Sequence, residues 1–124
     1  MLGLPPPAVL KVDLEIASAR DAVRSWIGRR PPVTAVCAYN DETAFALLAA
    51  ADGLGVVVPG VLAVIGVEDI RTAAFAHPPL TTISLDNQQH ARFVVTSLLA
   101  RLRGVEQPEA SSAVDHRIVV RVSA

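Results

Sequence analysis

Two pairs of polar residues closely follow apolar runs of the chain. Asn40 and Asp41 come after Val33–Ala38, and Glu68 and Asp69 come after Val61–Gly66. An amide and several carboxylates can donate and accept hydrogen bonds in fixed directions, which suits a small ligand rich in hydroxyl groups. Structural interpretations also exist, because Asn40 or Asp41 can cap a following helix and Asp69 can cap a short one. Both functions are compatible if Asn40 faces a cleft while Asp41 caps.

The elements that carry these residues are predicted to alternate between strand and helix. The runs 33–38 and 61–66 are apolar without alternation, which is typical of parallel strands covered on both faces. The order β-α-β-α-β-α-β-α-β predicts an α/β fold, a three-layer α/β/α arrangement with a mostly parallel sheet. The carboxyl ends of parallel strands share one edge, and ligands bind at that edge in open α/β sheets.

Local signals predict the remaining elements. Further strands are expected at 9–13, at 80–85 and at 117–122. In the last one Ile118, Val120 and Val122 alternate with Arg117, Val119 and Arg121, which predicts an edge strand or one with a wet face. A first helix is expected to begin with a capping box of Ser18 and Asp21 and to end at Gly28. The longest helix is expected from Asn87 to Arg103, closed by Gly104.

Composition restricts the function classes. With 124 residues the chain suits one domain, and 52% hydrophobic residues favour a well-buried globular protein. The net charge is −1 and lysine and arginine are dispersed, so this chain is not expected to hold DNA by itself. A secretory leader and an apolar run of about 20 residues are both lacking, so we expect a cytoplasmic protein without membrane contact. Cys37 is the single cysteine, expected as inert core.

Catalytic and metal chemistry find little support. His77, His90 and His116 lack metal-ligand spacing with one another or with Cys37, so neither a metal nor a cofactor is expected. An enzyme on a small doubly wound fold would need paired acids such as Asp41 and Glu68, but a nucleophile elbow and a phosphate loop are missing. A phospho-acceptor receiver would need a late lysine, whereas the one lysine is Lys11. The sequence therefore predicts a protein that is not an enzyme, with a small α/β enzyme or a stand-alone ligand-binding module as the alternative.

Four motifs occur in a family-specific order: AYND at 38–41, LG…VP at 54–59, VIGVED at 64–69 and PPLTTI at 78–83. These motifs resemble those of the effector-binding domain of LacI/GalR transcription regulators. The resemblance covers nearly the whole chain. The resemblance implies a periplasmic-binding-protein-like type I fold, with residues 1–124 forming the C-terminal portion and an incomplete C-terminal lobe. It also implies a repressor-type regulator that reaches DNA through a headpiece absent from this chain.

The resemblance assigns candidate site residues. Asn40 and Asp41 match the family's effector-contacting pair, and Glu68 stands where the family usually carries an aspartate that binds two ligand hydroxyls. The effector is therefore expected to be a small molecule of the sugar class, with Asp69 as a further contact or a cap. Phe45 and Phe75 lie on elements that resemble the family's dimer face, which implies a homodimer, with ordinary core packing as the alternative.

The resemblance also separates the helix at 85–105 from the rest. In the family's topology this helix belongs to the other lobe, yet its apolar residues must be buried somewhere. Leaving such a face in water costs several kcal/mol at about 25 cal/mol per Å². We expect the chain either to repack as one compact sheet or to pair with another copy.

Overall fold

The computed structural model describes residues 7–85, 87–105 and 116–124. Its elements in chain order are α1 (Ile16–Ile27), β1 (Ala35–Cys37), α2 (Asp41–Gly53), β2 (Ala63–Glu68), the 3₁₀ helix η1 (Arg71–Phe75), β3 (Thr81–Ser84), α3 (Asn87–Leu102) and β4 (Arg117–Val119).

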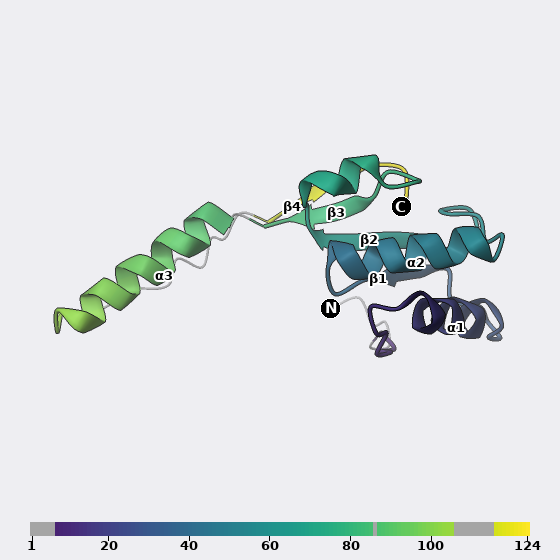
Figure 1. Ribbon diagram of the computed structural model, residues 1–124, viewed down its shortest axis with the longest axis horizontal. Helices are drawn as coiled ribbons and strands as arrows, with labels where there is room; N and C mark the ends of the chain where they lie inside the picture. Colours follow the sequence, from purple (N-terminus) through teal and green to yellow (C-terminus); the bar gives the residue numbers. More distant parts are fainter. Residues whose placement is uncertain (1–6, 86, 106–115) are drawn as a thin grey trace.

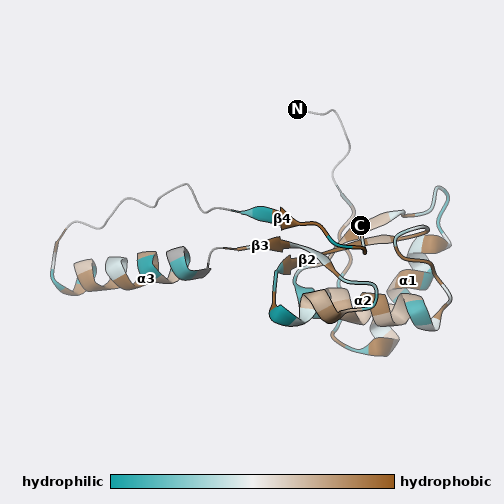
Figure 2. Cartoon of the chain, turned by 90° about the horizontal axis from the view of Figure 1, so that it is seen from above, coloured by the Kyte–Doolittle hydropathy of each residue, from teal (hydrophilic) through white to brown (hydrophobic). Residues whose placement is uncertain are grey.

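The strands form one sheet in the order β1-β2-β3-β4 (Figure 1). β1, β2 and β3 are parallel, and β4 joins β3 antiparallel, with Ile83 opposite Ile118. The predicted mostly parallel sheet is therefore confirmed, as is the edge position of the last strand, although that strand ends at Val119. The helices α1 and α2 lie on one side of this sheet (Figure 2).

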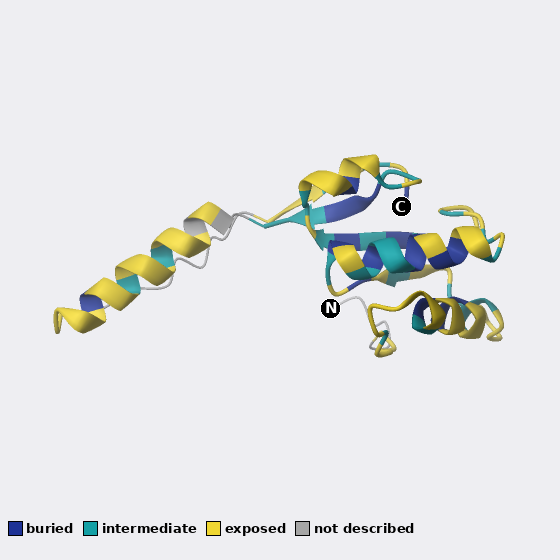
Figure 3. Ribbon diagram, in the orientation of Figure 1, coloured by how far each residue is buried: buried dark blue, intermediate teal, exposed yellow. Residues whose placement is uncertain are grey.

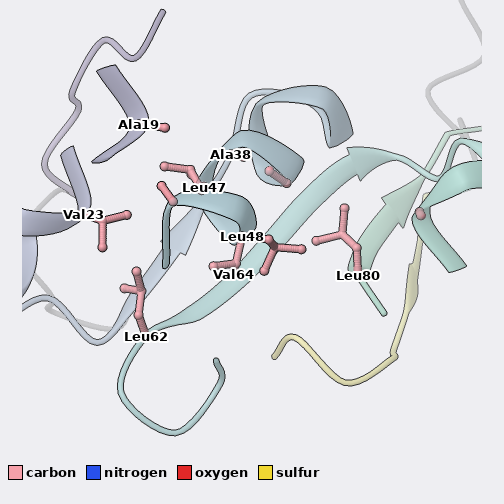
Figure 4. Packing of buried hydrophobic residues seen from close by; sticks show 11 residues of the cluster. Ala19, Val23, Ala38, Leu47, Leu48, Leu62, Val64 and Leu80 are labelled. Atoms are coloured by element: carbon pink, nitrogen blue, oxygen red, sulfur yellow. The ribbon is translucent and has the colours of Figure 1, made fainter. Parts of the chain in front are cut away.

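The core lies between that side of the sheet and the two helices. Leu47 and Leu48 of α2 meet Val64 of β2, and Leu62 and Leu80 extend the cluster along the sheet (Figure 4). α1 packs on α2 through Ala19 and Val23, which are fully buried. Alternate residues of β2 face this core because successive side chains of a strand point to opposite faces.

The N-terminal part differs from the prediction. α1 begins at Ile16 after the N-cap residue Glu15, so the predicted capping box of Ser18 and Asp21 is wrong. The Ser18 hydroxyl instead accepts a hydrogen bond of 3.0 Å from the Asp13 N–H, ahead of the helix. Residues 9–13 do not form a strand, whereas Gly28 ends α1 as predicted.

The helix α3 extends away from the sheet (Figure 1). Most of its surface is exposed (Figure 3), including the apolar side chains of Val94, Val95, Leu98, Leu99 and Leu102. The structure therefore does not have the compact single-sheet arrangement. The assignment of this helix to another lobe stays a prediction.

Candidate functional site

Asn40 follows β1 and is the N-cap residue of α2. Its side-chain Oδ1 accepts hydrogen bonds from the Thr43 N–H at 2.9 Å and from the Thr43 hydroxyl at 2.7 Å. The side chain thus satisfies one of the free N–H groups of the first helical turn. Asn40 is half-buried and lies at the carboxyl end of β1.

Asp41 does not act as the N-cap of α2, which is the role that the sequence suggested for it. It is the first residue of α2 and has no exposed surface. Its Oδ2 accepts a hydrogen bond of 2.9 Å from the Ile70 N–H, and its Oδ1 accepts one of 2.5 Å from the Thr82 hydroxyl. The carboxylate therefore joins the start of α2 to β3 and to the segment after β2, and the capping role predicted for Asp41 belongs to Asn40.

Glu68 and Asp69 form a turn with unusual backbone at the end of β2. Their φ angles are 110° and 53°, in the region that side chains other than glycine seldom adopt. Such backbone persists when surrounding contacts over-determine it, and it is concentrated at ligand-binding sites. Glu68 is exposed at the edge of the sheet, whereas the Asp69 side chain is only 18% exposed.

Asp69 is not a helix cap, contrary to the prediction. The N-cap residue of η1 is Ile70, and no side chain caps that helix. The Asp69 carboxylate instead forms an ion pair of 2.8 Å with the guanidinium of Arg121, which also donates to the Leu80 carbonyl oxygen at 2.7 Å. Arg121 therefore anchors the turn from the C-terminal segment.

Two residues of this arrangement were not identified from the sequence. Thr82 is fully buried and bonds to Asp41, although the sequence motif marked it only as part of a strand. Arg121 was assigned to the wet face of the last strand, but it follows that strand and turns inward. One sequence signal could have indicated an ion-pair partner for Arg121. This arginine is flanked by valines in a predicted edge strand.

The structure brings the four predicted site residues to one edge of the sheet. Glu68 is exposed and Asn40 is half-buried, while Asp41 and Asp69 engage internal partners. The arrangement can bind a hydroxyl-bearing ligand through an amide and a carboxylate. No cluster of metal-ligating side chains occurs in the described ranges. No helix there is long and apolar enough to cross a membrane.

The two phenylalanines of the predicted dimer face differ in exposure. Phe45 is half-buried and packs against the core cluster, which agrees with the alternative of core packing. Phe75 at the end of η1 is 84% exposed. Phe75 is therefore the one of the two with surface free for a partner.

Comparison with known proteins places the chain in a family. Residues 2–124 match the family model described as a periplasmic binding protein-like domain, and the chain belongs to that family, within the LacI/GalR-type transcription regulators. A similar curated protein is the HTH-type transcriptional repressor PurR of Photobacterium profundum, 29% identical over 93% of this chain and 34% of the relative. The repressor CytR of Escherichia coli (strain K12) is 28% identical over 95% and 35%. The chain thus spans about a third of these relatives' length.

Solved structures agree. A LacI family regulator from Arthrobacter sp. FB24, in complex with lactose, is 32% identical, with a TM-score of 0.68 over 87% of this chain and 42% of that one. A complex of the regulator CelR with cellobiose is 29% identical, with a TM-score of 0.75 over 91% and 35%. The predicted periplasmic-binding-protein-like fold is confirmed by these matches and by the family model.

Proposed function

We propose that this chain is the effector-sensing region of a LacI/GalR-type transcription regulator and that its effector is a sugar bound at the carboxyl ends of β1 and β2. Asn40 and Glu68 make the direct contacts in this proposal, and Asp41 and Asp69 hold them in position. Support comes from relatives that are transcriptional repressors and from similar regulators solved with lactose and cellobiose.

The observation that carries the proposal is the strained turn at Glu68, which follows β2 at the same edge of the sheet where Asn40 follows the neighbouring strand β1. The turn is held at three points: Asp41 binds the Ile70 N–H, Thr82 links Asp41 to β3, and Arg121 pairs with Asp69. A carboxylate kept on an exposed, unfavourable backbone by buried contacts is preorganised for a ligand rather than for stability. A ligand that binds one conformation of the sensor more tightly than another shifts its equilibrium, which is how a repressor responds to it.

The proposal predicts localised, weak sugar binding by this chain. Lactose or cellobiose added to ¹⁵N-labelled protein should shift the amide signals of Asn40, Glu68 and Asp69, with a dissociation constant on the order of millimolar because one wall of the site provides few contacts. Replacing Glu68 by glutamine should weaken binding about tenfold, because a charged hydrogen bond contributes roughly 1.5 kcal/mol or more.

Glu15→Gln is the matched control. Glu15 is exposed, its side chain makes no capping hydrogen bond, and it lies at the start of α1, away from the site. Binding by Glu15→Gln should equal that of the unmodified chain. Shifts scattered over the surface, or equal affinity of the Glu68 and Glu15 variants, would count against this sugar site.

The dimer is proposed to form through the face that carries Phe75. A large aromatic side chain at the centre of an interface often contributes more than 1 kcal/mol to binding. Phe75→Ser should raise the dimer dissociation constant about tenfold and change the free energy of unfolding of the monomer by less than about 0.5 kcal/mol. Light scattering over a concentration series measures the association, with Val57→Ser, another exposed apolar position, as the control. Equal association of both variants would exclude Phe75 from the interface.

The expectations on enzymatic activity, DNA contact and localisation follow from the class of transcription regulators. Relatives named HTH-type transcriptional repressors favour a regulator over an enzyme and support action at DNA in the cytoplasm. In this proposal DNA is contacted by a headpiece that has no counterpart in this chain.

A further inference from the structure

The carboxyl end of β1 carries an accessible aromatic side chain. Cys37, which the sequence predicted as inert core, is exposed, and 89% of the surface of Tyr39 is exposed. Tyr39 lies between β1 and Asn40, the N-cap residue of α2. An aromatic ring in contact with solvent is therefore adjacent in the chain to one of the two proposed ligand contacts.

Tyr39 differs in this position from the other aromatic residues of the chain, which has three phenylalanines, one tryptophan and one tyrosine. Trp26 and Phe45 pack against the core cluster, Phe93 lies on α3, and Phe75 lies on η1, which hydrogen-bonds to the chain ahead of β3. Among the described residues, Tyr39 is the exposed aromatic side chain at the carboxyl edge of the sheet.

The register of the sheet brings the chain out at this edge from both β1 and β2. Cys37 lies opposite Ile65 in the parallel pairing of the two strands. Asn40 comes three residues after Cys37, and Glu68 comes three residues after Ile65. Neighbouring strands are about 4.8 Å apart, which is close to the width of a six-membered sugar ring. One such ring can therefore reach both strand ends.

The two proposed polar contacts serve only the polar part of a sugar. Asn40 Oδ1 already accepts two hydrogen bonds from Thr43, which is its full capacity, so the donors of its amide nitrogen remain for a ligand. The Glu68 carboxylate can only accept. A pyranose also has two faces of C–H groups, which are stabilised by apolar contact and not by an amide or a carboxylate.

Tyrosine is suited to cover such a face. Its ring is flat and large, its face carries partial negative charge that attracts C–H groups, and it loses little conformational entropy because it has two χ angles. Tyr39 and Thr43 line the same hollow beside β1, and Thr43 holds the Asn40 side chain through its hydroxyl at 2.7 Å. The aromatic ring and the fixed amide therefore belong to one surface.

We propose that Tyr39 is the stacking surface of the effector site, on which one C–H face of a pyranose ring lies while Asn40 and Glu68 bind its hydroxyl groups. This inference rests on the proposed sugar site and adds the ligand class. The site selects a cyclic sugar with an unhindered face over an open-chain polyol, because the polyol has the hydroxyl groups but no flat face. Tyr39 is thus a specificity-determining residue.

Two small ligands test this selectivity on the chain as it is: methyl β-D-glucopyranoside, which is cyclic, and glucitol, which is open. Tyr39→Ala should weaken binding of the glucoside about tenfold, because a ring face removed from water on both partners contributes about that much. Binding of glucitol should change less than about twofold. Tyr39→Phe keeps the ring face and should bind the glucoside within about twofold of the unmodified chain. Titrations followed at the Glu68 amide signal measure all of these affinities.

The single tyrosine also gives a direct spectroscopic readout. In protein labelled with ¹³C only in the tyrosine ring, every ring signal belongs to Tyr39. Saturating these ring protons should transfer saturation to the C–H protons of the bound glucoside. The same sugar protons should move upfield, since they lie over the face of an aromatic ring.

Phe75→Ala is the matched control, because Phe75 is an aromatic residue that is 84% exposed and lies away from this edge. It should leave both affinities unchanged. If cellobiose shifts the Asn40 and Glu68 amides but Tyr39→Ala binds the glucoside as tightly as the unmodified chain, the stacking surface is excluded and the sugar site stands.

Two further outcomes overturn the proposal. Equal losses of glucoside and glucitol binding in Tyr39→Ala would mean that the substitution displaces Asn40 and that the ring face has no part in selectivity. Failure of the unmodified chain to bind cellobiose or the glucoside would remove the sugar site and the stacking surface together.

Discussion

Replacing Asp41 by alanine is expected to lower the free energy of unfolding by about 3 kcal/mol, because a buried carboxylate with charged hydrogen bonds is removed and its donors stay unpaired. Asp41 has no exposed surface and binds both the Ile70 N–H and the Thr82 hydroxyl. Urea unfolding followed by circular dichroism measures the change.

Variants of graded severity keep this expectation testable if the alanine variant does not fold. Asp41→Asn retains one acceptor oxygen and should lose about half as much, roughly 1–2 kcal/mol. Asp52→Ala, on the exposed surface at the other end of α2, should change stability by less than about 0.5 kcal/mol. If the two alanine variants were equally stable, Asp41 would not hold the segment after β2.

The arrangement of the site could be predicted because it depends on short-range pattern. The apolar runs at 33–38 and 61–66 lie on β1 and β2, and in a parallel sheet residues that follow neighbouring strands must emerge at the same edge. That argument needs no knowledge of side-chain contacts. It placed Asn40 and Glu68 correctly at one edge of the sheet.

The separate roles of Asn40 as N-cap and of Asp41 as buried hydrogen-bond acceptor could not be predicted in the same way. Both residue types are good N-caps, and a shift of one residue in the helix start exchanges their parts. The deciding factor is the buried donor pair, Ile70 N–H and Thr82 hydroxyl, which lies 29 and 41 residues further along the chain. Local preference carries no information about such distant partners.

Arg121 shows the same limit more strongly. Alternation with Ile118, Val120 and Val122 predicted a strand with a wet face, but the strand ends at Val119. Arg121 lies 52 residues from Asp69, and their ion pair forms because the C-terminal segment crosses the start of β3, where the Arg121 N–H donates to the Thr81 hydroxyl at 2.9 Å. Only the assembled sheet brings these charges together.

Elements without a partner in the chain were predicted with mixed success. The helix α3 forms as predicted, although its apolar side chains are exposed. Residues 9–13 have strand-forming composition but do not form a strand, since a strand needs a neighbour to satisfy its backbone groups.

Gly66→Ala is expected to lower the free energy of unfolding by about 2–4 kcal/mol, because overpacking alone costs about 1–3 kcal/mol and the Asp41 hydrogen bonds are displaced as well. A β-carbon at Gly66 would lie 2.9 Å from Leu80 Cδ2 and 3.2 Å from Asp41 Cγ, and it would overlap the Asp41 Oδ1 atom. Leu80 and Asp41 are both fully buried, so neither can move aside cheaply. Gly66 therefore provides the space in which the carboxylate sits.

Gly53→Ala is the matched control, because its β-carbon would also approach a side chain closely. The atom that it meets, at 2.8 Å, is the end of the flexible and exposed Arg20, and alanine has the higher helix propensity. This variant should be neutral or up to about 0.5 kcal/mol more stable in the same urea unfolding experiment.

The double variant Gly66→Ala/Asp41→Ala tests why glycine is required at position 66. The reason is either the space that Gly66 leaves for the Asp41 carboxylate or the backbone freedom of glycine. Removing the carboxylate empties the position that the new methyl group needs. The loss in the free energy of unfolding of the double variant should therefore be smaller than the sum of the two single losses, by about 1 kcal/mol or more. Strict additivity would mean that Gly66 is required for its backbone and not for the room it leaves to Asp41.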